Sequence, residues 1–349
     1  MTFQFHTAVR DRVGLLISIA GVSGSGKTFS ALRVARGLAG GDDSKIAVID
    51  TEAGRAKHYA PAPGEKPSAN RFGFSHGDLR PPFEPEAYVA AIEAAEAQGF
   101  AVIVIDSVSH EWEGEGGLHD VHDAILSEQI EAARRNHNAN WGPFDEDRQR
   151  EKLSLGAWRK PKERHKRFVQ RLLQCRAHLV MCLRADEKMR IEKVKDDRGR
   201  EKTVIIAAKD LPPAERWSPI CERRWPYEMT LSFVLSPDRP GFPIPIKLQE
   251  QHRSAVPLDR PLSEETGRML DEWARGGAPA PVAATPADDE IAELEATADA
   301  RAEAGMAAYQ AFWSGLTKAE RAALLPGHEA RKAVAASVGT NEEGRQPRQ

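Results

Sequence analysis

This sequence of 349 residues contains few cysteines, lacks long apolar runs and has no large excess of either charge. Its three cysteines, Cys175, Cys182 and Cys221, are an odd number and form no Cys-x-x-Cys pair, so they predict reduced thiols in a cytoplasmic protein. No apolar run approaches the length of a membrane span, and the N-terminus lacks a signal-peptide pattern. We therefore expect no membrane among its partners.

The charge balance is close to neutral, with a formal net charge of −3, 29% charged residues and 41% hydrophobic residues. These proportions are ordinary for a soluble globular protein. The near-neutral total is no evidence for nucleic acid, but it does not exclude it, because basic residues can cluster locally. The length suggests two or three structural units.

The most informative motif is Gly-Val-Ser-Gly-Ser-Gly-Lys-Thr at residues 21–28, a complete phosphate-binding P-loop. It follows a short apolar run typical of a buried strand and precedes apolar residues at helical spacing. Lys27 would reach the β- and γ-phosphates, and Thr28 would place its hydroxyl on Mg²⁺. We therefore predict a nucleoside triphosphate, taken as ATP, and Mg²⁺ as ligands. The predicted nucleotide-binding residues are Gly21, Val22, Ser23, Gly24, Ser25, Gly26, Lys27, Thr28 and Phe29.

A second motif adds acidic residues to this site. Residues 101–106, Ala-Val-Ile-Val-Ile-Asp, end in Asp106 and match the Walker B pattern, which would hold a carboxylate beside Thr28 for Mg²⁺. The next residue is Ser107, not the glutamate that many AAA-type motors use to activate water. We therefore predict that Glu52, at the end of the second predicted strand, is the catalytic base. An exposed loop carboxylate is the alternative for Glu52.

Strand-like and helix-like segments alternate from about residue 15 to residue 183, which predicts an α/β fold with a mostly parallel central sheet flanked by helices. The predicted strands cover 15–20, 45–50, 101–106 and 178–183. The predicted helices cover 27–38, 85–97, 118–135 and 161–174. Residues 136–155 show no clear period, so no element is predicted there.

The character of the chain changes after residue 183. The predicted elements there are a hairpin over 188–195 and 202–207, a strand over 229–235, a proline-containing edge strand over 244–248 and a closing helix over 263–275. The predicted domains are an ATPase core at 1–275 with a β-rich extension from about 186, an Ala/Pro-rich linker at 276–289, a small helical module at 290–338 and a disordered tail at 339–349.

Two motifs resemble segments of RecA/RadA-type recombinases. Residues 48–54, Val-Ile-Asp-Thr-Glu-Ala-Gly, look like the segment that carries the recombinase catalytic glutamate, and residues 103–108 look like their Walker B segment. The runs 106–117 and 158–188 resemble phage and prophage AAA-family ATPases with a RecA-like core. The resemblance covers about half the chain. It implies a RecA-like P-loop ATPase in the cytoplasm of a bacterial host, acting in DNA recombination, annealing or replication.

The resemblance also suggests where further charges act. RecA-like cores place a polar sensor of the γ-phosphate at the end of a strand, and Arg184 fits that place, as a third catalytic residue beside Lys27 and Glu52. Lys188 or Arg190 would instead reach the nucleotide of a neighbouring subunit, and ordinary surface cations are the alternative for all three.

Possible partners follow from other segments. The basic run 159–167 begins a predicted helix whose cationic face would lie along the phosphates of single-stranded DNA, with a solvated helix face as the alternative. Residues 5–8, Phe-His-Thr-Ala, match a pattern by which recombinase subunits link, a weak indication of a homo-oligomer. The helical tail would recruit phage recombination or single-strand-binding proteins, or simply pack on itself.

Two other classes of function stay open. A P-loop kinase would use the same Lys27 and Asp106 to phosphorylate a small acceptor, with residues 190–200 as a loose candidate for an arginine-rich lid. A nucleotide-gated assembly or scaffold protein would hydrolyse ATP slowly and recruit partners through its tail. His110, His119 and His122 lack a further matching ligand set, so surface histidines are expected rather than a metal site.

Overall fold

The computed structural model describes residues 14–138, 142–195, 201–212, 215–276 and 288–338. The chain forms two compact units, Met1–Gly277 and Ala278–Gln349. The Phe-His-Thr-Ala pattern at 5–8, nearly all of the linker predicted at 276–289 and the tail predicted at 339–349 lie outside the described residues.

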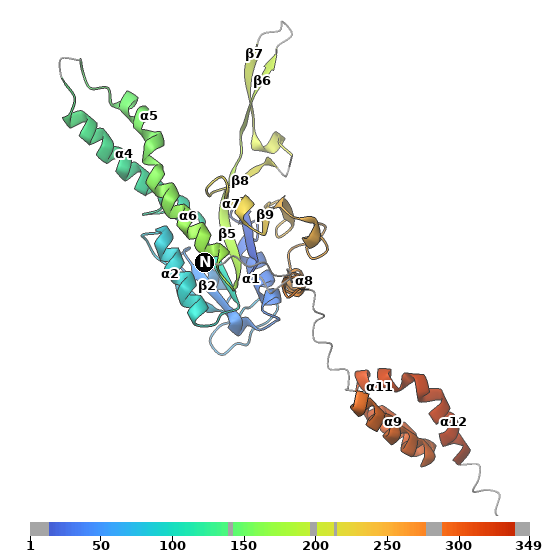
Figure 1. Ribbon diagram of the computed structural model, residues 1–349. Coiled ribbons are helices and arrows are strands. Elements are labelled where there is room, and N and C mark those ends of the chain that lie inside the picture. The colour runs from blue at the N-terminus through green and yellow to red at the C-terminus, as the bar shows by residue number, and fades with distance from the viewer. Residues whose placement is uncertain (1–13, 139–141, 196–200, 213–214, 277–287, 339–349) are drawn as a thin grey trace, which may run out of the picture. The chain divides into compact units, whose positions relative to one another are not determined.

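A central, mostly parallel sheet organises the first unit (Figure 1). Its strand order is β10-β9-β1-β5-β4-β2-β3; the strands from β9 to β3 are parallel, β10 is antiparallel to β9, and β8 pairs with the end of β5. The strands are β1 (Leu16–Gly21), β2 (Ile46–Asp50), β3 (Ser75–Asp78), β4 (Val102–Asp106), β5 (His178–Glu187), β8 (Trp217–Pro219), β9 (Leu231–Leu235) and β10 (Pro243–Lys247).

Helices cover both faces of this sheet, which confirms the predicted α/β class. One face packs against α1 and α8, and the other against α2, α6 and the short α7. The helices of this unit are α1 (Lys27–Leu38), α2 (Pro85–Ala97), α3 (Ser109–Glu113), α4 (Leu118–Arg135), α5 (Glu146–Ala157), α6 (Arg159–Leu173), α7 (Trp225–Glu228) and α8 (Glu264–Ala274). Short 3₁₀ turns cover Asp43–Lys45, Arg55–Tyr59, Ala208–Asp210 and Glu250–His252.

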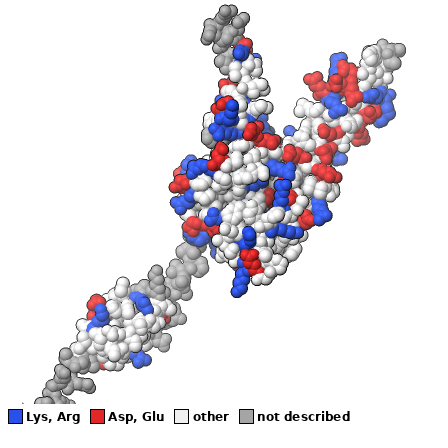
Figure 2. All heavy atoms as spheres, turned by 180° about the vertical axis from the view of Figure 1, so that it is seen from behind, with Lys and Arg blue, Asp and Glu red and all other residues white. Residues whose placement is uncertain are grey.

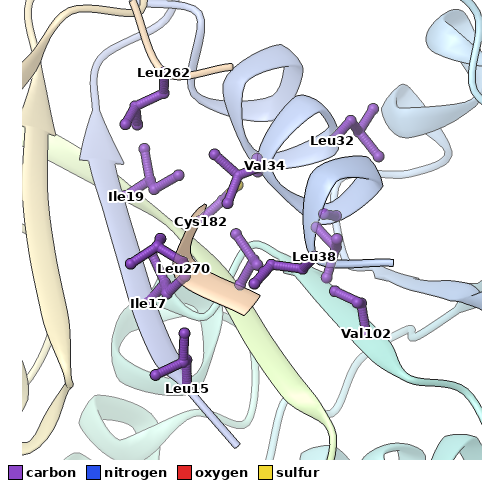
Figure 3. Close-up of a cluster of buried hydrophobic side chains, with 14 of the residues drawn as sticks. Leu15, Ile17, Ile19, Leu32, Val34, Leu38, Val102, Cys182, Leu262 and Leu270 are labelled. Atoms are coloured by element: carbon purple, nitrogen blue, oxygen red, sulfur yellow. The ribbon is translucent and has the colours of Figure 1, made fainter. Parts of the chain in front are cut away.

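The two cores follow from the alternation of side chains along each strand. Successive residues of a strand point to opposite faces, so a strand buried on both sides is apolar throughout. In β1, Ile17 and Ile19 belong to the core under α1 and α8, whereas Leu16 and Ala20 belong to the core under α2 and α6. Figure 3 shows Ile17 and Ile19 facing the side chains of α1 and α8.

Helices α1 and α8 approach each other closely at two glycines. A Cβ added at Gly37 would lie 2.0 Å from the carbonyl oxygen of Glu264, and one added at Gly267 would lie 2.1 Å from that of Val34. No side chain fits at either position, so the backbones themselves are in contact. This contact ties the closing helix to the helix that follows the P-loop.

The β-rich extension predicted from about residue 186 is not one unit in the structure, because its strands belong to two different sheets. Strands β6 (Arg190–Lys195) and β7 (Glu201–Ile206) form a separate antiparallel hairpin, with residues 196–200 outside the described part of the chain. Strands β9 and β10 instead complete the central sheet, β9 beside β1. The reason is that every residue of β9, Leu-Ser-Phe-Val-Leu, is buried, as in a strand inside a sheet.

The second unit is helical. Its helices are α9 (Asp288–Glu303), α10 (Met306–Gly315), α11 (Lys318–Leu324) and α12 (His328–Val338), with a 3₁₀ turn at Leu325–Gly327. Its core is small and contains Ala298, Ala302, Tyr309, Leu324 and Ala335. In neither unit do the described residues include a helix long and apolar enough to cross a membrane.

Candidate nucleotide-binding site

The P-loop connects β1 to α1 at the carboxyl edge of the sheet. Gly24 and Gly26 have φ angles of +82° and +83°, a region that favours glycine. The buried Ser25 hydroxyl donates a hydrogen bond to the carbonyl of Val22 at 2.8 Å, which fixes the loop from inside. The N–H groups of the first turn of α1 have no acceptor within the helix, so they are available to an anion.

A cleft of about 410 Å³ opens beside this loop. That volume lies in the range typical of small-molecule sites. Of the predicted residues, the cleft is lined by Val22, Ser23, Gly24, Gly26, Lys27, Thr28, Glu52 and Asp106, together with Arg55, His58 and Tyr59. Three separate segments of the chain therefore meet here, and the P-loop faces both acidic residues.

Three of the predicted nucleotide-binding residues do not line the cleft. Gly21 ends β1, and a Cβ there would lie 2.3 Å from the Ser25 hydroxyl. Ser25 itself is fully buried behind the loop. The Phe29 ring packs against Tyr59, at 5.7 Å between ring centroids, and against Phe72. Gly21, Ser25 and Phe29 shape the loop, and their side chains do not face the nucleotide space.

Thr28 and Asp106 are in direct contact. The Thr28 hydroxyl donates to Asp106 Oδ2 at 2.6 Å, while Oδ1 is buried with no hydrogen-bond partner among the described residues. Burial raises the pKa of Asp106, and the Thr28 hydrogen bond and the charge of Lys27 act in the opposite direction. A hydroxyl beside a carboxylate with a free oxygen is a donor set that suits Mg²⁺, so these residues fit the predicted metal.

Glu52 projects from a tight turn after β2 that Asp50 organises. Asp50 is fully buried, and its carboxylate accepts hydrogen bonds from the backbone N–H groups of Glu52, Gly54 and Ala56 at 2.7, 3.3 and 3.0 Å. These bonds close the turn, in which Ala53 takes a positive φ of 57°. The turn fixes where the backbone of Glu52 lies.

Arg184 lies within β5, opposite Gly21 of β1, because the strand continues to Glu187 beyond the end predicted at 183. It holds the Glu52 carboxylate in a two-pronged ion pair. Its Nε lies 2.9 Å from Oε1 and its Nη2 lies 3.1 Å from Oε2. Burial acts to raise the pKa of Glu52, but the hydrogen bonds and charge of Arg184, with His110 and Lys27, outweigh it and the pKa is lowered. Glu52, the predicted base, is therefore ionised, but both of its carboxylate oxygens are bound by Arg184, the predicted sensor.

Sequence reasoning missed the residues that support this pair. His110 was expected at the surface, but it is buried, bonds the Thr51 hydroxyl at 2.7 Å and lies 3.9 Å from Glu52. Thr51 also joins the two acidic segments, because its hydroxyl accepts from the Ser107 N–H at 2.7 Å. Only the position of Thr51 directly after a strand hinted at this role. His110 sits one helical turn past its strand, where no sequence pattern marks it.

Of the predicted cations, only Lys27 lines the cleft; Arg184 reaches it through its ion pair with Glu52, and the others lie elsewhere. Arg190 pairs with Glu192 at 2.8 Å and Glu215 at 2.7 Å, on the β6–β7 hairpin. Lys188 is exposed immediately before β6, and its backbone N–H donates to the carbonyl of Arg216. Neither contacts the nucleotide cleft of its own chain.

The basic run on α6 is partly neutralised by α2. Arg164 is within 2.5 Å of Glu86 and 3.1 Å of Glu84, and Arg171 is 3.0 Å from Glu93. On the face drawn in Figure 2, acidic and basic side chains are interspersed along the arm that contains α4 and α5. The paired arginines therefore brace α6 against α2 rather than forming a continuous cationic stripe.

The fold and this cleft define an α/β P-loop NTPase. A family model described as an AAA domain matches residues 14–210, more than half of the chain. The chain belongs to the AAA domain family, which indicates a nucleotide-binding ATPase. A search of the curated proteins finds no match.

Proposed function

We propose that this protein hydrolyses ATP with Mg²⁺ and that its AAA domain is a RecA-like core of phage type acting in DNA recombination, annealing or replication. The observation that carries the catalytic part is the cleft shared by Lys27, Thr28, Glu52 and Asp106. An ammonium, a hydroxyl and two carboxylates from separate segments are what a magnesium triphosphate and its attacking water require.

Each residue has a defined task in this proposal. Lys27 and the P-loop N–H groups bind and orient the phosphates, and Thr28 and Asp106 would hold Mg²⁺, which neutralises charge on the triphosphate when bound. Glu52 orients or deprotonates the attacking water. Arg184 stabilises charge on the γ-phosphoryl oxygens.

The Glu52–Arg184 ion pair implies an order of events. While Arg184 binds both oxygens of Glu52, the carboxylate is a weak base, because its pKa is lowered. A γ-phosphate competes with Glu52 for the same guanidinium. Its arrival releases Glu52 to the water, so that the base becomes active only when the nucleotide is present.

The RecA-like and DNA-related parts have separate support. Strand β5, which contains the proposed sensor, lies between the P-loop strand β1 and the Walker B strand β4. The segments at 48–54 and 103–108 resemble those of RecA/RadA-type recombinases. Trp112 stacks on Trp158 at 5.4 Å between centroids, and Trp158 also stacks on His122 at 4.4 Å. The partly exposed ring of Trp112 is therefore the one proposed to stack on a base.

Steady-state ATPase measurements test both parts together. Glu52→Gln removes the base without changing side-chain shape, so we expect ATP binding to persist and turnover to fall by roughly 10²–10⁴-fold. Single-stranded DNA is expected to raise the turnover of the unaltered protein. Full turnover in Glu52→Gln refutes the catalytic assignment, and the absence of any DNA effect on rate or binding refutes the DNA role alone.

The same assay separates the alternatives. A kinase would require an added acceptor for turnover, and its candidate lid is weakened because Arg190 is already paired with Glu192 and Glu215. An assembly protein would oligomerise with ATP in both the unaltered protein and Glu52→Gln, without stimulation by DNA.

A further inference from the structure

A second cavity, of about 530 Å³, lies on the opposite side of the sheet from α1, between α6 and α7. Lys162 and Lys166 of α6 and Arg224 just before α7 line it, above a floor of His165 and Trp225. Spacings of four and three residues place Lys162, Lys166 and Val169 on one face of α6. None of these residues lines the nucleotide cleft.

The three cations of this cavity differ from their neighbours. Arg164, Arg167 and Arg171 on the same helix are each paired with a glutamate. Within the described ranges, no ion pair is formed by Lys162, Lys166 or Arg224. Three arginines of α6 are therefore paired with glutamates, whereas the lysines and the arginine that line the cavity keep a cluster of positive charge there.

The polar groups of the cavity wall favour an anion. Trp225 is buried, and its indole N–H has no acceptor in the part of the chain that the structure describes. Of the two carboxylates in the wall, Glu222 already accepts the backbone N–H of Arg224 at 2.5 Å. Donors thus outnumber free acceptors, and lysine ammonium groups are effective point charges for phosphate.

The cavity is connected to the nucleotide site through α3. His165 in its floor bonds the buried Glu111 of α3 at 2.9 Å. Ile220, two residues before the cavity residue Glu222, is bonded to the same helix, because its carbonyl accepts the Ser109 hydroxyl at 2.7 Å. The Ser109 hydroxyl also accepts the backbone N–H of Arg184 at 2.9 Å. The Ser109 link ends at Arg184 itself. The His165 link ends at Glu111, which is next in sequence to His110, the residue 3.9 Å from Glu52.

We propose that this cavity is a second phosphate-binding site, which takes a phosphate oxyanion of a nucleic-acid strand or of a free phosphorylated molecule, and that its occupant changes the rate of ATP hydrolysis. The binding part is independent of the function proposed above. The effect on rate rests on the proposed ATPase activity.

Binding is tested on the full chain saturated with Mg²⁺ and a non-hydrolysable ATP analogue, so that the P-loop is filled. Inorganic pyrophosphate is titrated by calorimetry, and a labelled 20-nucleotide oligothymidylate by fluorescence anisotropy. In Lys162→Gln/Lys166→Gln, we expect affinity for the bound probe to fall at least about tenfold, because two charge-assisted contacts are lost. For the oligonucleotide, the slope of log affinity against log salt is expected to decrease by about two.

A matched control carries the same change of charge. Lys66→Gln/Lys152→Gln alters two exposed lysines, before β3 and on α5, that do not line the cavity, and it is expected to bind like the unaltered protein. Tighter binding of the oligonucleotide than of pyrophosphate identifies a nucleic-acid strand as the source, and the reverse identifies a free phosphorylated molecule. Equal binding by both double variants, or no binding of either probe, overturns the site.

The effect on hydrolysis is read separately, as kcat at saturating ATP with and without the bound probe. We expect kcat to change in the unaltered protein and in the control, and to stay constant in Lys162→Gln/Lys166→Gln. If the probe binds through these lysines and kcat is unchanged, the regulatory part is overturned. If no protein hydrolyses ATP, the proposed function fails while the binding result stands.

Discussion

At the scale of single residues, the Glu52–Arg184 pair sets the charge state of the site. The carboxylate is buried, which alone would raise its pKa, yet the two-pronged contact with Arg184 lowers it. If one partner of such a pair is removed, the other is left as a buried charge without compensation, which is energetically unfavourable. The pair therefore predicts a change in the pH dependence of activity.

We expect Arg184→Met to raise the pKa of Glu52, because the raising effect of burial is then opposed only by the weaker, lowering effects of His110 and Lys27. A base works when deprotonated, so kcat/KM of the unaltered protein should stay high below the ordinary pKa of a glutamate, near 4.3. In Arg184→Met, the fall of kcat/KM should begin at higher pH, and the plateau should be roughly 10²–10³-fold lower. Arg80→Met is the control and should leave the profile unchanged, since Arg80 is 78% exposed, pairs with Asp78 and does not line the cleft. An unchanged acidic limb in Arg184→Met would contradict the assignment.

The pKa of Asp106 is shifted in the opposite direction from that of Glu52, and this shift affects the stability of the folded protein. Burial raises its pKa, so the folded state holds the proton more tightly than the unfolded state, and stability is lost as pH rises through the folded pKa. At pH 7, Asp106→Asn should therefore stabilise the nucleotide-free protein, by ~2–4 °C in Tm if about 1 kcal/mol is gained. The same change should abolish Mg²⁺-dependent turnover.

Calorimetry at pH 7 and pH 3 checks this prediction. The gain in Tm should shrink at the lower pH, where Asp106 of the unaltered protein is protonated in both the folded and the unfolded state. The exposed Asp259→Asn serves as the control and should leave Tm unchanged. A lower Tm for Asp106→Asn at pH 7 would show that the ionised carboxylate stabilises the empty site.

The sequence indicates the residues proposed to contact the nucleotide better than the residues that position them. Lys27, Thr28 and Asp106 stand in motifs whose spacing is set by the triphosphate itself. Asp50 and His110 act only through contacts that the fold creates, Asp50 with the turn after β2 and His110 with Thr51. Such contacts depend on three-dimensional packing, and no local pattern encodes them.

At the scale of elements, the contact between α1 and α8 leaves no room for larger side chains at its two glycines. Gly37→Ala and Gly267→Ala each push a methyl group into the backbone of the facing helix. Although alanine favours helices over glycine, we expect each change to lower the free energy of unfolding by about 1–3 kcal/mol, the usual cost of overpacking. Urea denaturation measures this directly.

Gly156 provides the matched control for this pair. It lies inside α5 with no atom within 4 Å of an added Cβ. Gly156→Ala should therefore stabilise by up to about 1 kcal/mol, as helix propensity alone predicts. If Gly37→Ala stabilises to the same degree, the helices do not approach as closely as the structure indicates.

Elements were predictable where one physical signal dominated. The structure confirms the bounds predicted for α1, α2 and α4, because their apolar residues follow a helical period and their ends carry clear breaks. Helix α5 escaped prediction because few of its residues are buried, so its apolar pattern is weak. The place of β9 escaped it too, because pairing with a strand more than 200 residues earlier leaves no trace in local sequence.

At the scale of the whole molecule, the chain builds separate hydrophobic cores for its two units. The ATPase unit has large cores on both faces of its sheet, whereas the described core of the helical unit has few buried residues, of which Tyr309 is the largest. A small core supplies little stability, so a single truncation can unfold it. The two units should therefore respond differently to substitution and to ligand.

Tyr309→Ala tests this separation. Tyr309 is 1% exposed and its hydroxyl lies 3.0 Å from His328 Nδ1, so its truncation removes roughly 3–5 kcal/mol and should unfold the helical unit. Limited proteolysis should then cleave within residues 288–338, while ATP turnover and the rise in Tm caused by a bound ATP analogue stay unchanged. Leu325→Ala, at a residue 63% exposed, should alter neither property. The residues of the helical core and the residues that line the nucleotide cleft are different. A loss of turnover in Tyr309→Ala but not in Leu325→Ala would therefore mean that the helical unit acts on the nucleotide site.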